Sequence, residues 1–220
     1  MRKITRTVTT TLAAAGLLVG AGAVGSAFVA PADAATATIP APTAQIPVVA
    51  GKTTQVALDA GFLKALTTLK LTPGVIGDAT LSKSGTLTFP ITGGFIDYWS
   101  PSLHYRPYVQ GNLLHEGSGI SLAAGGKKVS LEDFIIHPGN NSYISGTVLL
   151  NGKTVGTNVD IFRLDGSTLN PVTQDSSGDY VLKGTTVYVS DDAAALLNKT
   201  FGITAVTGSL KVGVATLTVK

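Results

Sequence analysis

The chain has 220 residues, no cysteine, 26 glycines and only 13% charged residues against 44% hydrophobic ones. The absence of cysteine excludes disulfides, thiolate metal sites, a cysteine nucleophile and lipid attachment through an N-terminal cysteine. Low charge combined with many Gly and Thr residues is more typical of a β protein than of a helical bundle, and the apolar content suffices for one domain.

Residues 1–34 have the three parts of an export signal. Basic residues start the segment, residues 12–30 form an apolar stretch, and a small-x-small cleavage pattern ends at Ala34. We expect cleavage after Ala34 rather than retention as a transmembrane helix, because glycines interrupt the apolar stretch and Pro31 ends it. The predicted product is secreted, without a transmembrane anchor after cleavage, and is either extracellular or held non-covalently at the cell wall.

Loss of that segment makes the protein almost neutral. It removes three basic residues and Asp33, which leaves 13 Lys or Arg against 12 Asp or Glu, a net charge of +1. Binding to nucleic acid requires a concentrated positive patch, and the remaining chain offers only Lys127 and Lys128 as neighbouring basic residues. We therefore expect no nucleic-acid partner.

The remaining chain divides into a short spacer and one domain. Residues 35–50 hold three prolines and no charge, which predicts an extended spacer or an edge strand. Residues 51–220 alternate between apolar runs and turn signals throughout, which predicts a single β-sandwich domain.

Two stretches of this domain combine a strand with a short amphipathic helix. In residues 55–72, Asp59 is the expected N-cap and apolar residues then recur at helical spacing. In residues 186–204, Ser190 is the expected N-cap and Gly202 ends the helix. The two stretches align as a weak internal repeat, which predicts two similar strand-helix corners on one β scaffold.

Short strands fill the space between these corners. Two Gly-Gly pairs and one Gly-Ser-Gly run separate the apolar runs of residues 86–136. Tight turns are expected at these places, including one at residues 117–119. Asn151-Gly152 supplies the positive φ angles of a type I′ hairpin turn. About ten strands are expected, and the predicted fold class is mainly β: an antiparallel β-sandwich or flattened barrel with two short helices.

Reactive side chains are densest in one part of the chain. Aromatic rings there would supply stacking area, an arginine a fork for a carboxylate, and a tyrosine or histidine a ligand to iron, which suits a flat anionic ligand. The alternative is that the rings are buried at the sandwich edge with their polar ends in water. The candidate ligand-binding residues are Tyr98, Trp99, His104, Tyr105, Arg106, Tyr108 and His115.

Other chemistry has weaker support. The histidines show no spacing typical of a zinc site, and no metal site is predicted. No nucleophile motif occurs, so no catalytic residue is assigned and the protein is expected not to be an enzyme. A carbohydrate site stays open as an alternative, because Asp97 and Glu116 flank the aromatic cluster that includes Trp99 and Tyr105.

Four segments carry a resemblance to a known family. They resemble secreted actinobacterial β-rich proteins, which are distantly similar to the haem-transport-associated domain of cell-surface proteins, a β-rich module that binds haem through a tyrosine supported by a histidine. The segments are LTFPITGGFID (87–97), GNLLHEGSGISL (111–122), KKVSLEDFIIHP (127–138) and ALLNKTFGI (195–203).

The haem domain carries its tyrosine in a W-x-x-x-x-S-F-R-x-Y segment. The run WSPSLHYRPY keeps Trp99, Arg106 and Tyr108 in register with that segment. His104 and Tyr105 stand in place of the Ser-Phe pair. The resemblance implies haem as a possible cofactor, Tyr108 as its iron ligand and His115 as the supporting residue.

Three hypotheses follow. The first is a secreted, non-enzymatic β-sandwich protein of the cell envelope or extracellular space, whose surface binds an envelope component or extracellular ligand. The second is a module that binds haem or another small ligand. The third is a carbohydrate-binding or carbohydrate-active protein. Convergence of the candidate side chains in one concave pocket would favour the second or the third.

Overall fold

The structure is a computed structural model that describes residues 38–47 and 52–220. The export signal predicted for residues 1–34 lies outside these ranges, and so do the two ends of the predicted spacer. Within the described ranges, no helix is long and apolar enough to cross a membrane. Residues 39–220 belong to one compact unit.

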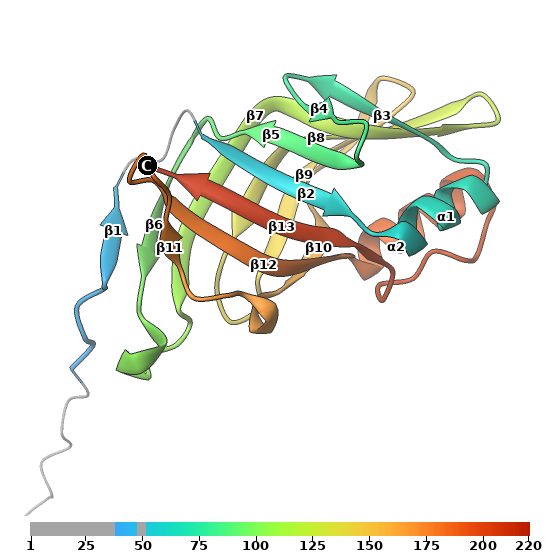
Figure 1. The fold of residues 1–220 in the computed structure, drawn as a ribbon. Coiled ribbons are helices and arrows are strands. Elements are labelled where there is room, and N and C mark those ends of the chain that lie inside the picture. Colours follow the sequence, from blue (N-terminus) through green and yellow to red (C-terminus); the bar gives the residue numbers. More distant parts are fainter. Residues whose placement is uncertain (1–37, 48–51) are drawn as a thin grey trace, which may run out of the picture. The chain divides into compact units, whose positions relative to one another are not determined.

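One continuous antiparallel sheet makes up most of this unit (Figure 1). Its strand order is β1-β6-β7-β8-β9-β10-β12-β13-β2-β5-β4, with β3 paired to β7 and β11 paired to β12. The strands are β1 (Ala44–Ile46), β2 (Thr53–Leu58), β3 (Thr72–Gly77), β4 (Thr80–Leu81), β5 (Thr86–Pro90), β6 (Gly93–Tyr98), β7 (Val109–Ala124), β8 (Lys127–His137), β9 (Tyr143–Leu150), β10 (Lys153–Asp165), β11 (Thr173–Gln174), β12 (Tyr180–Val189) and β13 (Lys211–Val219).

The sheet curls, and its two halves are linked at the junction of β5 and β6. Strand β5 pairs with β2, and β6 pairs with β7, although only Ile91 and Thr92 separate β5 from β6. The Ile91 N–H donates to the Lys52 carbonyl at 2.7 Å and the Thr92 N–H to the Leu114 carbonyl at 2.8 Å, so the chain passes directly from one half to the other. The predicted antiparallel β class is confirmed, with the sandwich layers built as two halves of one curled sheet.

Two short helices close one end of the curled sheet. Helix α1 (Ala60–Thr68) follows β2, and helix α2 (Asp191–Phe201) follows β12. Both strands run antiparallel to β13, which lies between them, so they run parallel to each other and deliver their helices to the same end. Side chains of α1 and α2 line one small apolar pocket there, and Figure 1 shows the helices next to each other. The two predicted strand-helix corners are confirmed.

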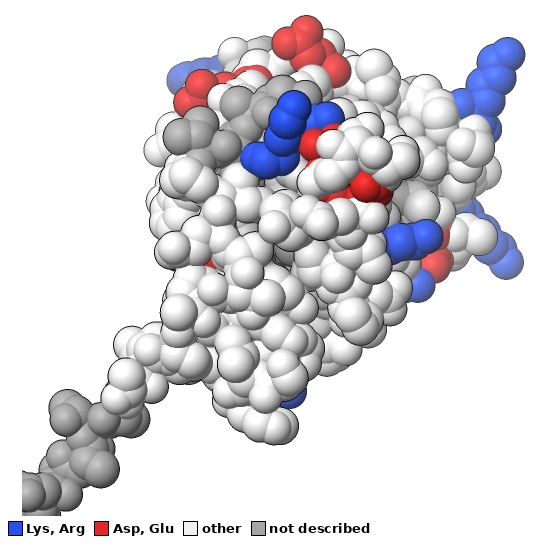
Figure 2. Space-filling model, turned by 60° about the vertical axis from the view of Figure 1, so that its left-hand side comes forward, with Lys and Arg blue, Asp and Glu red and all other residues white. Residues whose placement is uncertain are grey.

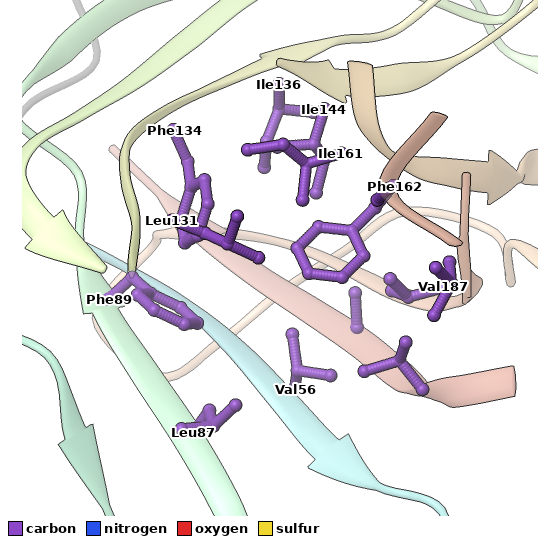
Figure 3. Close-up of a cluster of buried hydrophobic side chains, with 14 of the residues drawn as sticks. Val56, Leu87, Phe89, Leu131, Phe134, Ile136, Ile144, Ile161, Phe162 and Val187 are labelled. Atoms are coloured by element: carbon purple, nitrogen blue, oxygen red, sulfur yellow. The ribbon is translucent and has the colours of Figure 1, made fainter. Parts of the chain in front are cut away.

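The interior has three levels between this helical end and the opposite end. At the helical end, Leu66 of α1 and Leu197 of α2 are buried near Leu122 of β7. The middle level is aromatic: the Phe134 ring centroid lies 5.5 Å from that of Phe89 and 6.0 Å from that of Phe162. Figure 3 shows these rings pointing toward one another from both halves of the sheet.

Three connections meet at the third level, the end away from the helices. They are the β6–β7 loop, residues 99–108, which contains the 3-10 helix η1 (Pro101–Leu103), the β8–β9 turn at residues 138–142, and the start of the β10–β12 connection, which contains η2 (Gly166–Thr168). Because neighbouring strands alternate in direction, all three leave the sheet at the same end (Figure 1).

Candidate functional site

A cavity of about 1060 Å³ opens at the end of the fold away from the helices, and its lining extends to the start of α2, at Ser190, Asp191 and Asp192. Ligand pockets typically measure about 300–1,000 Å³, so this one lies just above that range. Its deep walls are apolar and come from both halves of the sheet. These wall residues are Val56, Ile96, Leu113, Ile136, Ile144, Phe162, Leu182, Val187, Ala215 and Leu217.

Three of the predicted site residues line this cavity: Tyr98, Arg106 and Tyr108. Tyr98 is the last residue of β6 and lies two positions after the buried Ile96, so strand alternation directs both side chains to the interior. Tyr108 is partly exposed and immediately precedes β7. The two tyrosines therefore lie together at the opening of the cavity, which we call the mouth, and each is held at the end of a strand.

Arg106 brings a positive charge to the same mouth. Its guanidinium carbon lies 4.7 Å from the centroid of the Tyr108 ring, a cation–π contact. Among the residues that the structure describes, no carboxylate forms a salt bridge with this guanidinium. Its forked N–H donors are thus available to an anionic group of a ligand.

Trp99, Tyr105 and His104 do not line the cavity. The Trp99 side chain is 6% exposed, and its indole N–H donates to the Pro40 carbonyl at 2.8 Å. The Tyr105 ring packs on Trp99 with centroids 4.9 Å apart. His104 is exposed and ends η1 in the left-handed region, with φ 52°. The predicted cluster is therefore divided, with Trp99 and Tyr105 packed behind the mouth.

His115 lies in the middle level of the interior and is 2% exposed. Its Nε2 is 2.8 Å from Thr54 Oγ1, and its Nδ1 is 3.3 Å from the Phe134 carbonyl oxygen. Because a carbonyl only accepts, Nδ1 carries the proton and Nε2 accepts from the Thr54 hydroxyl. Burial lowers the pKa of His115 to about 4, so the ring is neutral at pH 7.

The structure separates His115 from Tyr108. They are seven positions apart along a nearly continuous strand, which corresponds to about 23 Å. The supporting contact implied by the family resemblance is therefore not made, and this expectation is corrected: both hydrogen-bonding atoms of His115 already have partners inside the core. Thr54, which also lines the cavity, stands between the cavity and His115.

The residues of the carbohydrate hypothesis do not converge either. The Asp97 carboxylate accepts from the Gln45 side chain at 3.2 Å, and strand alternation places it on the other face of β6 from Tyr98. Glu116 is exposed, and neither carboxylate lines the cavity. The described ranges also contain no group of three or more His, Cys, Asp or Glu side chains that could hold a metal ion.

The opposite wall of the cavity was not found by sequence reasoning. Asn140 and Asn141 of the β8–β9 turn and Asn170 of the β10–β12 connection line it, together with Leu182 and Leu217. Asn140 and Asn141 follow Pro138 and Gly139, Asn170 precedes Pro171, and the leucines belong to ordinary strand alternation. No signal in the sequence distinguishes them from structural residues, because only the curling of the sheet brings them opposite Tyr98 and Tyr108.

The end of the molecule that carries η1 is poor in charge. The loop that contains η1 forms the lowest part of the folded unit in Figure 1, and it keeps this place in Figure 2 because the view is turned about the vertical axis. Figure 2 shows almost no Lys, Arg, Asp or Glu in this lowest part. The charged side chains on that face gather in the upper part and toward one edge. Apart from charged residues of the cavity lining such as Arg106, Arg163 and Asp165, this end carries little charge, which favours a ligand of largely apolar character.

No family model matches the sequence, and no curated protein matches it. Solved structures do match the fold. The C-terminal domain of HtaA from Corynebacterium glutamicum superposes with a TM-score of 0.52 and 11% identity, over 80% of this chain and 99% of that domain. The haem-binding protein HtaB of the same organism gives a TM-score of 0.50 and 8% identity, over 80% of this chain and 96% of that one.

The chain shares its fold with these two proteins. The resemblance to the haem-transport-associated domain is thereby confirmed as a distant relationship in fold. At this level of identity the likeness extends to the course of the chain and assigns no residue of the site.

Proposed function

We propose that this protein binds haem in the 1060 Å³ cavity and that it acts without catalysis. The observation that carries the proposal is the combination, at one end of the fold, of a large apolar cavity with two tyrosines and an arginine at its mouth. HtaB, which shares the fold, is a haem-binding protein.

Each part of the cavity has a role in this proposal. The apolar walls would cover the macrocycle, since burial of apolar surface contributes about 25 cal/mol per Å². A tyrosine oxygen is an established ligand of haem iron, and Tyr108 is the residue that the family resemblance indicates. Arg106 would bind a propionate through its free fork of donors. Tyr98 is the second phenol of the same mouth.

The cavity changes the order of the three hypotheses. A protein that acted through its surface alone would not need about 1060 Å³ of internal space, so ligand binding replaces general surface interaction as the leading function. The carbohydrate hypothesis loses support because Trp99 is buried and its indole N–H is already bonded to Pro40. Export, and an envelope or extracellular setting, remain part of the proposal on the strength of the N-terminal sequence.

The test is a titration of haemin, followed by Soret absorbance, into the chain starting at residue 35. Ala215→Phe places a ring in the cavity wall, and Val155→Phe places the same ring at a position that is 53% exposed. We expect saturable binding by the wild type and by Val155→Phe, and strongly weakened binding by an Ala215→Phe variant that still unfolds cooperatively. Equal binding by a folded Ala215→Phe variant would place haem outside the cavity, and a flat wild-type titration would reject haem.

A further inference from the structure

A short segment ahead of the main sheet lies against the mouth of the cavity. We name residues 39–46, which end in β1, the strap. The Thr43 N–H donates to the Tyr98 carbonyl at 2.7 Å, and the Ser100 N–H donates to Thr43 Oγ1 at 2.8 Å. Ala44 then pairs with Tyr98 as β1 joins the edge of β6 (Figure 1). The strap is thus bonded to the residues at both sides of Trp99.

Trp99 connects the strap with the β6–β7 loop. Its indole N–H donates to the Pro40 carbonyl at 2.8 Å, and its backbone N–H donates to the Tyr108 carbonyl, also at 2.8 Å. Its ring packs against Tyr105, the neighbour of Arg106. One residue therefore contacts the strap, the base of the loop and the loop itself.

The loop has few backbone bonds of its own. Besides the bond at its base, the described backbone bonds within residues 99–108 are those from the Leu103 N–H to the Ser100 carbonyl and from the His104 N–H to the Pro101 carbonyl, both around η1. A segment with so few internal bonds opens locally at low free energy unless other parts of the molecule hold it. The strap and the buried Trp99 ring supply that restraint.

We propose that the strap, acting through Trp99, positions Arg106 and Tyr108 at the mouth, so that docking of the strap and occupation of the cavity are coupled. None of the strap residues lines the cavity, so the coupling runs through the loop. Coupling of this kind is reciprocal: a docked strap strengthens ligand binding, and a bound ligand stabilises the docked strap to the same extent. The inference rests on the proposed function only for the identity of the ligand.

Two variants loosen the strap without touching the cavity lining. Trp99→Phe keeps an aromatic ring and removes the N–H that bonds Pro40, and Thr43→Val removes the hydroxyl that bonds Ser100. Thr67→Val is the matched control, because it removes an exposed hydroxyl bonded to the Leu63 carbonyl within α1. Loss of one such hydrogen bond corresponds to about a fivefold effect on an equilibrium constant.

The experiment measures haemin affinity together with hydrogen–deuterium exchange in the same variants. We expect Trp99→Phe and Thr43→Val to bind haemin about fivefold more weakly than Thr67→Val and to exchange faster in residues 98–109 as well as in the strap. We also expect haemin to slow exchange in the strap of the wild type. Trp99 is a positioning residue in this proposal. If Trp99 and the strap had a purely structural role, haemin would not slow hydrogen exchange in the strap.

Three results would overturn the inference. One is unchanged affinity and exchange in both variants. Another is faster exchange confined to the strap, which would mean that the loop holds itself. The third is wild-type binding of haemin with no change of exchange in the strap. If the wild type binds no haemin at all, the proposed function fails, and exchange in residues 98–109 alone then decides whether the strap positions the loop.

Discussion

The mouth of the cavity lies at the start of β7, and His115, bonded to Thr54 of β2, lies farther along the same strand. The polar groups of the two regions differ in how far their hydrogen-bonding capacity is used. At the mouth, Tyr98 and Tyr108 are partly exposed, and the Arg106 guanidinium contacts the aromatic ring of Tyr108. In the core, both ring nitrogens of His115 are bonded and burial keeps the imidazole neutral. The polar groups of the mouth can therefore still form hydrogen bonds to a ligand. Those of the Thr54–His115 pair are already hydrogen-bonded within the core and stabilise the fold.

This difference shows how proximity in sequence misleads in a β protein. Tyr108 and His115 are only seven residues apart, but an extended strand carries them about 23 Å apart. The same pair in a helix would be two turns apart on one face. In a β-sheet, the residues that share a site come from neighbouring strands. Tyr98, at the end of β6, and Tyr108, just before β7, are an example.

The largest effect expected from this comparison is a loss of stability in acid. The pKa of His115 is about 4 in the folded protein and about 6.5 when unfolded, so the unfolded state binds more protons between these values. Stability is complete above pH 6.5 and falls by about 3 kcal/mol as the pH drops to 4. Urea unfolding at several pH values measures this slope.

The control for the acid slope is another histidine. His104→Gln changes an exposed residue and should leave the slope intact, whereas His115→Leu should flatten most of it. Burial also lowers the pKa of the partly exposed His137, which adds a smaller contribution of the same sign. A steep slope that survives in His115→Leu would contradict the assignment of a neutral, buried His115.

The next largest effect belongs to the mouth. Tyr108→Phe removes only the phenol oxygen, and we expect haemin affinity to fall at least about tenfold, or about 1.4 kcal/mol, with the urea midpoint unchanged. Tyr188→Phe, which alters a phenol outside the cavity lining, is the matched variant. Equal affinities of the two variants would remove Tyr108 from the site.

A cap at the helical end should affect stability and leave binding alone. Asp59 Oδ1 accepts from the Gly61 N–H at 2.8 Å at the start of α1, and Asp59 does not line the cavity. Loss of such an N-cap typically costs about 1 kcal/mol, so Asp59→Ala should destabilise the protein. Because this cap belongs to the helical end, haemin affinity measured on the folded variant should equal that of the wild type. A loss of affinity would show that the two ends are not independent.

The smallest effect concerns the charge of Arg106. Arg106→Gln should weaken haemin binding about threefold, or about 0.6 kcal/mol, since an exposed ion pair contributes little. Haemin dimethyl ester, which lacks the free carboxylates, should bind the variant and the wild type equally. An equal loss for both ligands would mean that Arg106 acts on the Tyr108 ring rather than on a carboxylate.

The features predictable from the sequence are those fixed by local chemistry. Asp59 caps α1 by accepting from the Gly61 N–H at 2.8 Å, and Gly202 ends α2 with φ 69°. Asn151 and Gly152 adopt φ 51° and 81° in the hairpin turn. Each depends on a few neighbouring residues, so a single sequence suffices to find it.

The turn expected at residues 117–119 was wrong for a physical reason. Strand β7 runs through this stretch with a β-bulge, in which Gly117 has φ 72° and its N–H donates to the Asp133 carboxylate at 2.9 Å. A bulge and a turn both favour glycine at positive φ, so the residue type alone does not separate them. The far wall of the cavity was missed for a related reason, since it depends on long-range pairing.

The measurement that tests the account most directly is a paired haemin titration of two variants under identical conditions. One carries Tyr98→Phe and Tyr108→Phe, and the other carries His115→Leu, each with its urea unfolding curve at pH 7.5. We predict that the double variant keeps the wild-type stability and loses the Soret shift, while His115→Leu is less stable and, where folded, binds as the wild type does. The reverse pattern, with binding lost in folded His115→Leu and kept in the double variant, would contradict the separation of a ligand-binding mouth from a structural core.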